Sequence, residues 1–194
     1  MGIPSYFSHI VKNHRKIIKK YANNICTIDN LYLDSNSIIY DVIRELNATS
    51  NDEQTIIKVI CEKIKQYIEI ISPTQQIFIA FDGVAPLAKL DQQRTRRYKG
   101  EFQRNLLREL ECDHDENIND TQNCFDTVLI TPGTLFMKKL SDYVIKYFKN
   151  PSDFCVNKII VSTSNEPGEG EHKIYEYIRQ RKDYHFDTST VIYG

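Results

Sequence analysis

Short apolar runs alternate with amphipathic helical segments along this chain, and this alternation constrains the fold more than any other feature. Helical periodicity extends from about Asp52 to Ile71, from the turn at 131–134 to about Lys149, and onward from about Glu169. Strands separated by helices predict an α/β fold in which helices flank a parallel central sheet. The runs that we expect to form strands are Asn30–Leu33, Gln76–Phe81, Lys158–Ser162 and Thr190–Tyr193.

The length of 194 residues suits a single domain, and no visible linker divides the chain. We therefore expect one domain over residues 1–194. The segment 112–123 is rich in acids and lacks hydrophobic periodicity. This pattern predicts an acidic surface loop within that domain.

Composition disfavours several classes of protein. No apolar run approaches the ~20 residues that a membrane-spanning helix needs, and the first residues do not resemble a signal peptide. The cysteines are odd in number, widely spaced and without a Cys-x-x-Cys pair, which disfavours a disulfide framework and a zinc site. We therefore expect that the protein does not associate with a membrane. We also expect its cysteines to be reduced thiols, as in a protein of the cytoplasm or the nucleus. The cysteines are Cys26, Cys61, Cys112, Cys124 and Cys155.

Acidic residues follow three of the expected strands. Asp34 and Asp82 follow the first two, and Glu166, Glu169 and Glu171 follow the third. The carboxyl ends of parallel strands lie at one edge of a sheet, so these side chains can converge there. Clustered carboxylates repel one another unless a cation neutralises them, and oxygen ligands suit Mg²⁺ or Mn²⁺. Two such ions can support phosphodiester hydrolysis. An acid after a strand is also a common helix N-cap, and for each acid this alternative stays open.

A cationic stripe follows the second of these acids. The net charge of −1 does not indicate a nucleic-acid-binding protein, but seven Lys and Arg residues lie between Lys89 and Arg108. Four donors fall at the i, i+4, i+7 and i+8 spacing of one helix face, and such a face can hold a phosphate through bidentate arginine contacts. The alternative is a solvated basic helix face. The four residues are Lys89, Gln93, Arg96 and Arg97.

Five blocks of this sequence together resemble the XRN family of 5′→3′ exoribonucleases, relatives of the flap endonucleases. They follow the family's order, from the opening MGIPSYF to SNEPGEGEHKIYEYIR, which is similar to its paired-glutamate motif. LYLDSNSIIY resembles the family's first metal-binding segment, and IAFDGVAPLAKLDQQRTRRYK resembles its longest signature. ITPGTLFMKKLSDYV is similar to a helix-opening signature. Five ordered blocks are specific, whereas PGEGEHK alone would be only suggestive.

The resemblance implies a PIN- or flap-nuclease-like fold and a role for each candidate residue. The matched metal ligands and catalytic acids are Asp34, Asp82, Glu169 and Glu171. The cationic stripe matches the pocket that selects a 5′-monophosphate in this family and is too small for a cap or a triphosphate. A complete site of this type holds two Mg²⁺ or Mn²⁺ ions.

The sequence departs from the family pattern at three places. Tyr40 stands where the family usually has a His that stacks on substrate bases, and Tyr can still stack. Leu87 stands where the family tends to have Arg. In the family, the block similar to Val-Ile-Tyr-Gly continues into a Leu-Asp-Ala-Asp segment with further metal ligands, whereas this chain ends at Gly194. We therefore expect an incomplete nuclease domain that binds metal weakly and degrades RNA slowly or not at all.

Three functions are compatible with this sequence. The resemblance favours a metal-dependent 5′→3′ exoribonuclease that acts on 5′-monophosphorylated RNA, with single-stranded DNA as an alternative substrate. The second is a catalytically impaired nucleic-acid-binding relative that retains the phosphate pocket. The third, a flap-type DNA nuclease, is disfavoured because QQRTRRYK resembles the exoribonuclease branch.

Overall fold

The structure is a computed structural model that describes residues 5–17, 27–46, 52–87, 89–91, 94–95, 98–100, 102–103, 106 and 125–194. Within these ranges, the residues described between positions 87 and 106 are helical. The other elements are, in chain order, α1 (Tyr6–Asn13), η1 (Arg15–Ile17), β1 (Asn30–Asp34), α2 (Asn36–Leu46), α3 (Glu53–Ile71), β2 (Gln76–Ala80), η2 (Thr127–Leu129), α5 (Leu135–Tyr147), η3 (Pro151–Phe154), β3 (Lys158–Ser162), α6 (Gly170–Gln180), α7 (Lys182–Phe186) and β4 (Thr190–Tyr193).

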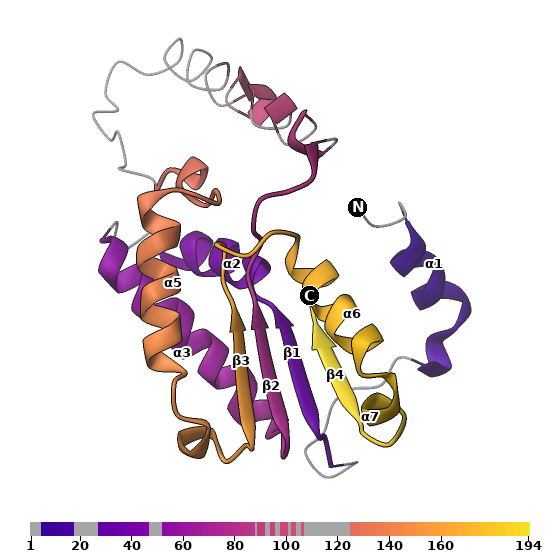
Figure 1. Cartoon of the computed structure of the whole chain (residues 1–194). Coiled ribbons are helices and arrows are strands. Elements are labelled where there is room, and N and C mark those ends of the chain that lie inside the picture. The colour runs from indigo at the N-terminus through magenta and orange to yellow at the C-terminus, as the bar shows by residue number, and fades with distance from the viewer. Residues whose placement is uncertain are drawn as a thin grey trace.

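The strands form one parallel sheet in the order β3-β2-β1-β4, so the predicted α/β class is confirmed. Figure 1 shows all the strands pointing the same way, with the chain leaving each of them at the same edge. In register, Leu33 lies opposite Ile79 and Tyr193, and Ile79 lies opposite Val161. The carboxyl ends of β1, β2 and β3 are therefore level, which brings the segments that follow them together.

Helices cover both faces of the sheet (Figure 1). Alternate strand residues point to opposite faces. Leu31, Leu33 and Ile77 pack with the buried residues of α2, α3 and α5 in the larger core. Tyr32 and Phe78 face the other way and pack against Ile174 of α6. Because β1 and β2 are buried on both faces, they read in the sequence as continuous apolar runs rather than alternating ones.

The helix boundaries follow from local capping. Asp52 accepts a hydrogen bond from the Thr55 amide at 3.0 Å, which satisfies a donor that the first turn of α3 leaves open. Thr134 caps α5 in the same way through the Met137 amide. Gly133 precedes this cap with φ of 92°, a conformation that glycine adopts without strain. The helix predicted from about Asp52 to Ile71 is thus confirmed, with Asp52 as its cap.

Most expected elements are found, with small shifts at their ends. The second strand ends at Ala80 rather than Phe81, and the helix after the turn at 131–134 ends at Tyr147. Helix α2 was not predicted, because it follows β1 after one residue and carries β-branched Ile38 and Ile39 in its first turn.

The remaining expectations concern the loop, the membrane and the thiols. The expected loop at 112–123 lies outside the described residues. In the part of the chain that the structure describes, no helix has both the length and the apolar character needed to cross a bilayer. Cys61, which is buried, and Cys155, which is exposed, are free thiols. The other cysteines lie outside the described residues.

Candidate active site

Two aspartates from neighbouring strands meet at the first residue of α6. Asp34 is the last residue of β1, and Asp82 lies two residues beyond β2. The Gly170 amide donates a hydrogen bond to Asp82 Oδ1 at 2.7 Å. A Cβ atom built on Gly170 would lie 2.5 Å from Asp34 Oδ1, which is closer than real Cβ atoms come. The structure therefore brings both aspartates against the amino end of α6, and a side chain at position 170 would displace the Asp34 carboxylate.

The amino end of α6 suits negative charge. The first amides of a helix have no partner within the helix, and the helix dipole adds partial positive charge there. The bond from Gly170 to Asp82 uses one of these amides. Glu169 precedes the helix as its N-cap, without a side-chain capping bond, and Glu171 lies in the first turn. The alternative that Glu169 serves only as a capping side chain is therefore not supported.

The loops that carry the acids are joined by backbone hydrogen bonds. The Gly83 amide donates to the Gly168 carbonyl at 2.8 Å, and the Gly168 amide donates to the Val84 carbonyl at 3.2 Å. The Asp82 amide donates to Asn36 Oδ1 at 3.1 Å, which ties the loop after β2 to the start of α2. The position of Asp82 is thus set by the segments that follow β1 and β3.

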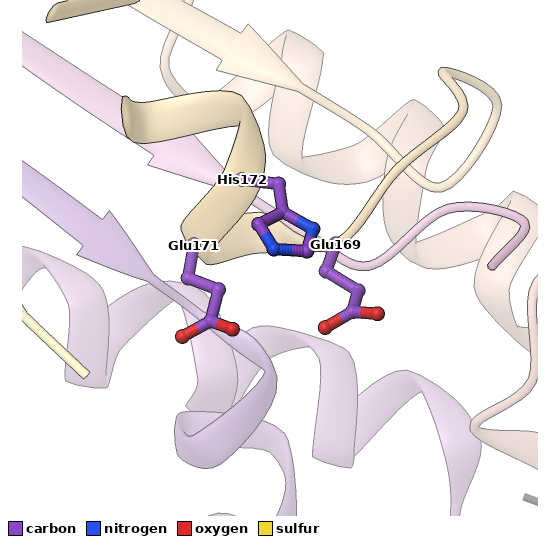
Figure 2. Close-up of side chains that lie close together, drawn as sticks. All are labelled: Glu169, Glu171 and His172. Carbon is purple, nitrogen blue, oxygen red and sulfur yellow. The ribbon is translucent and has the colours of Figure 1, made fainter. Parts of the chain in front are cut away.

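A glutamate pair and a histidine lie beside the aspartates. Figure 2 shows the Glu169 and Glu171 carboxylates directed to the same side, with the His172 ring between them. One ligand atom from each of the three lies within 4.8 Å of the others. Glu169 is buried, whereas Glu171 and His172 are exposed. His172 was not predicted as a site residue, and its position next to Glu171 in the paired-glutamate motif is the sequence signal that could have indicated it.

Negative charge accumulates at this edge of the sheet. The pKa of Asp34 is raised from 3.8 to about 6, first by burial and then by the charge of Asp82, with smaller contributions from Glu171 and Glu169. The Asn36 amide, which donates to Asp34 Oδ1, opposes this rise. Carboxylate oxygens that destabilise one another's charge fit a divalent cation of the Mg²⁺ or Mn²⁺ type, because such an ion relieves the repulsion.

Lys89 is the described member of the cationic stripe. Its ammonium group forms an ion pair with the Glu169 carboxylate; the Glu169 side chain is buried and the Lys89 side chain is partly exposed. The structure thus places a residue predicted to bind phosphate in direct contact with a residue predicted to bind metal. The other members of the stripe, Gln93, Arg96 and Arg97, lie outside the described residues. The phosphate-binding role of all four stays a prediction.

The predicted stacking residue lies on α2. Tyr40 is 38% exposed, so part of the residue is accessible to solvent. Leu87, the departure from the family pattern, is 85% exposed and packs against little of the described chain. Neither observation tests base stacking, which stays a prediction for Tyr40.

Two more residues lie near these acids. Glu166, one of the acids after β3, accepts a hydrogen bond from the Ser162 hydroxyl. This bond ties its carboxylate to the end of β3. Lys173 on α6 donates to two backbone carbonyls at the ends of β2 and β3. Burial lowers the pKa of Lys173, and the charges of Glu166 and Asp82 partly oppose that shift.

A pH-dependent difference in stability is expected between the chain and its Asp34→Asn variant. Because the pKa of Asp34 is raised to about 6 in the folded state, the folded chain holds the proton more tightly than the unfolded chain. Stability from this group is then fully present below about pH 4 and is lost as the pH rises through about 6. After a discount for partial solvent exposure, we expect a loss on the order of 1–2 kcal/mol.

Urea unfolding between pH 4 and 7 in the presence of EDTA measures this difference. The free energy of unfolding of the parent chain should fall relative to that of Asp34→Asn across this range. A difference between the two proteins that does not change with pH would contradict the stated environment of Asp34.

The fold and the acidic edge define an α/β domain of the PIN or flap-nuclease type. Comparison with known proteins identifies the family within this class. The chain belongs to the family described as the XRN 5′-3′ exonuclease N-terminus, which matches it over residues 1–194.

Similar proteins carry names that agree with this family. The chain is 35% identical over 211 residues to 5′-3′ exoribonuclease 1 of Saccharomyces cerevisiae, covering all of this chain and 13% of that protein. It is 34% identical over 233 residues to 5′-3′ exoribonuclease 2 of Kluyveromyces lactis, covering all of this chain and 23% of that protein. For 5′-3′ exoribonuclease 1 of Schizosaccharomyces pombe, the identity is 34% over 205 residues, again over all of this chain and over 15% of the relative. The chain thus spans less than a quarter of the length of these relatives.

Proposed function

We propose that this chain supplies part of the active site of a metal-dependent 5′→3′ exoribonuclease that acts on 5′-monophosphorylated RNA. The single observation that carries the proposal is the meeting of Asp34 and Asp82 at Gly170, beside Glu169 and Glu171. The names of the relatives support the reaction class and RNA as the substrate. The metal and the 5′-monophosphate are part of the proposal.

The acidic residues would hold one or two Mg²⁺ or Mn²⁺ ions. When bound, such ions lower the pKa of a coordinated water and stabilise the leaving oxygen of a phosphodiester. The chain itself contributes the arrangement of the ligands. Asp34 is the last residue of β1, Asp82 lies two residues beyond β2, and the hydrogen bond from Gly170 orients the Asp82 carboxylate. Glu169 is the N-cap of α6 and Glu171 lies in its first turn. Ligands held by regular elements and hydrogen bonds limit the reorganisation needed when a cation binds.

The cationic stripe would hold the 5′-phosphate of the RNA. The ion pair between Lys89 and Glu169 supports a phosphate site beside the acids. A terminal phosphate held there would present the first phosphodiester bond to the metal-binding acids. Tyr40 would stack on a substrate base, because its ring is partly exposed on α2.

Selection of the 5′ end is the test of this proposal. We expect Arg96→Ala or Arg97→Ala each to cost about 1.5–3 kcal/mol in binding of 5′-monophosphorylated RNA, because charge-assisted contacts to phosphate are strong. Competition between 5′-monophosphorylated and 5′-hydroxyl RNA measures the preference. Arg179→Ala, on the exposed end of α6, is the matched control and should leave the preference unchanged. Equal affinity of the parent chain for the two RNAs would contradict the pocket.

A second candidate function is an RNA-binding relative that retains the phosphate pocket but hydrolyses RNA poorly. The ion pair between Lys89 and Glu169 favours this candidate, because the ammonium group offsets negative charge that a metal ion would otherwise use. Selective binding of 5′-monophosphorylated RNA without decay in Mn²⁺ would identify it. Decay that depends on both Mn²⁺ and Asp82 would instead identify the exoribonuclease.

A further inference from the structure

Lys173 connects α6 to the ends of two strands. It lies two residues after Glu171, and its ammonium group donates hydrogen bonds to the Phe81 and Thr163 carbonyls, each at 2.8 Å. Phe81 directly follows β2, and Thr163 directly follows β3. One side chain of the helix thus holds the backbone of both strands at the edge where the acids lie.

These carbonyls are in a part of the sheet where the backbone ladder ends. The Phe81 amide donates to the Ser162 carbonyl at 2.9 Å, which continues the pairing of β2 and β3 beyond the regular strands. Phe81 is 1% exposed and Thr163 is 5% exposed. A buried carbonyl that loses its hydrogen-bond donor destabilises the fold by about 1–3 kcal/mol. The contacts of Lys173 with these carbonyls therefore stabilise this part of the sheet.

The contacts of Lys173 determine where Asp82 lies relative to the glutamates. Phe81 is the residue before Asp82, whereas Glu169 and Glu171 flank the first residue of the helix that carries Lys173. We propose that Lys173 is a positioning residue that sets the spacing between Asp82 and the two glutamates, and so the affinity of the acidic edge for a divalent cation. The part that concerns cation affinity rests on the proposed metal site.

A purely electrostatic role for Lys173 predicts the opposite effect. Its positive charge lies close enough to Asp82 and Glu166 to interact with both. If only this charge mattered, its removal would leave the edge more negative and strengthen cation binding. If the contacts with the carbonyls position Asp82, removal weakens cation binding. The sign of the change therefore separates the two roles.

The test compares the full 194-residue chain with Lys173→Met, which keeps most of the side-chain volume and removes the ammonium group. We expect Lys173→Met to bind Mn²⁺ about 10–100-fold more weakly by isothermal titration calorimetry, the loss typical of residues that orient metal ligands. Lys158→Met is the matched control, because Lys158 is the exposed first residue of β3 at the opposite edge of the sheet. It should bind Mn²⁺ as the parent chain does.

Hydrogen exchange of the Gly170 amide gives a second readout that needs no metal. This amide donates to Asp82 Oδ1 in the structure, so displacement of Asp82 should make it exchange at least tenfold faster in Lys173→Met. Exchange at the parent rate, or Mn²⁺ binding that is unchanged or tighter, would overturn the proposal. If the parent chain binds no Mn²⁺, the metal site fails, and the exchange of Gly170 still decides whether Lys173 positions Asp82.

Lys173→Arg replaces the methionine variant if the latter does not fold, as judged by circular dichroism. Arginine keeps the positive charge, but its branched guanidinium group places no single nitrogen where the lysine nitrogen contacts both carbonyls. We expect Lys173→Arg also to bind Mn²⁺ more weakly and to exchange the Gly170 amide faster than the parent chain, but by smaller factors than Lys173→Met. Parent-like values in both measurements for this variant would overturn the proposal.

Discussion

Asp82→Ala is expected to abolish measurable binding of Mn²⁺ by this chain. Asp82 is the acid that the Gly170 amide orients, and its charge raises the pKa of the neighbouring Asp34. If Asp82 is a direct carboxylate ligand, as we propose, its loss should exceed the 10–100-fold loss in affinity typical of residues that only support a ligand. Isothermal titration calorimetry with Mn²⁺ measures the affinity. Asp142→Ala, an exposed aspartate on α5, is the matched control and should bind as the parent does.

The same variant tests hydrolysis. A time course with end-labelled, 5′-monophosphorylated RNA and Mn²⁺ should show at most slow decay by the parent chain and none by Asp82→Ala. Phosphodiester hydrolysis with two ions requires a full ligand set, and misplacing a catalytic group by 1 Å can cost about a hundredfold in rate. Decay at the same rate in both proteins would show that the activity comes from a contaminating nuclease or from residues other than these acids.

Gly83→Ala is expected to destabilise the fold by more than about 3 kcal/mol, at the upper end of the cost of overpacking. A Cβ atom at this position would lie 1.7 Å from the Glu166 carbonyl oxygen and 3.3 Å from the Gly168 carbonyl oxygen. These atoms belong to the backbone, so no side-chain rotation relieves the overlap. The loops after β2 and β3 would have to separate, with loss of the hydrogen bonds between them. Urea unfolding followed by circular dichroism measures the change.

Gly100→Ala is the control for that substitution. A Cβ atom at Gly100 meets no atom of the described residues within 4 Å. Position 100 is helical, and alanine is favoured over glycine in a helix by about 1 kcal/mol. We therefore expect unchanged or slightly increased stability for Gly100→Ala. A Gly83→Ala variant as stable as Gly100→Ala would contradict the close contact of the two loops.

Strands β1 and β2 were predictable because burial on both faces leaves a strong local signal. In β2, for example, apolar and mostly β-branched or aromatic residues run from Ile77 to Ala80. The helix Glu53–Ile71 was predictable for a related reason, since its buried isoleucines recur at helical spacing and Asp52 provides a cap. The acids Asp34 and Asp82 could be placed at one edge because parallel strands end at the same side of a sheet.

Other features depend on contacts between segments far apart in the chain. Gly170 reads as an ordinary helix-starting residue, and its role is visible only because Asp34 and Asp82 lie against it. Lys173 reads as one of many lysines, and its two carbonyl partners belong to segments 92 and 10 residues away. The hydrogen bond that Glu166 accepts from Ser162 is likewise visible only in the structure.

The sequence alone determined the fold class, the four strands and the acids that follow them, because these depend on hydrophobic patterning and on the geometry common to parallel sheets. Five sequence blocks in the family's order also showed the resemblance to the XRN family. Only the tertiary structure decided the order β3-β2-β1-β4, the meeting of Asp34 and Asp82 at Gly170, and the contact of Lys89 with Glu169. The physical reason is that strand order and side-chain contacts arise from packing between distant segments, which leaves no periodic signal in any one of them.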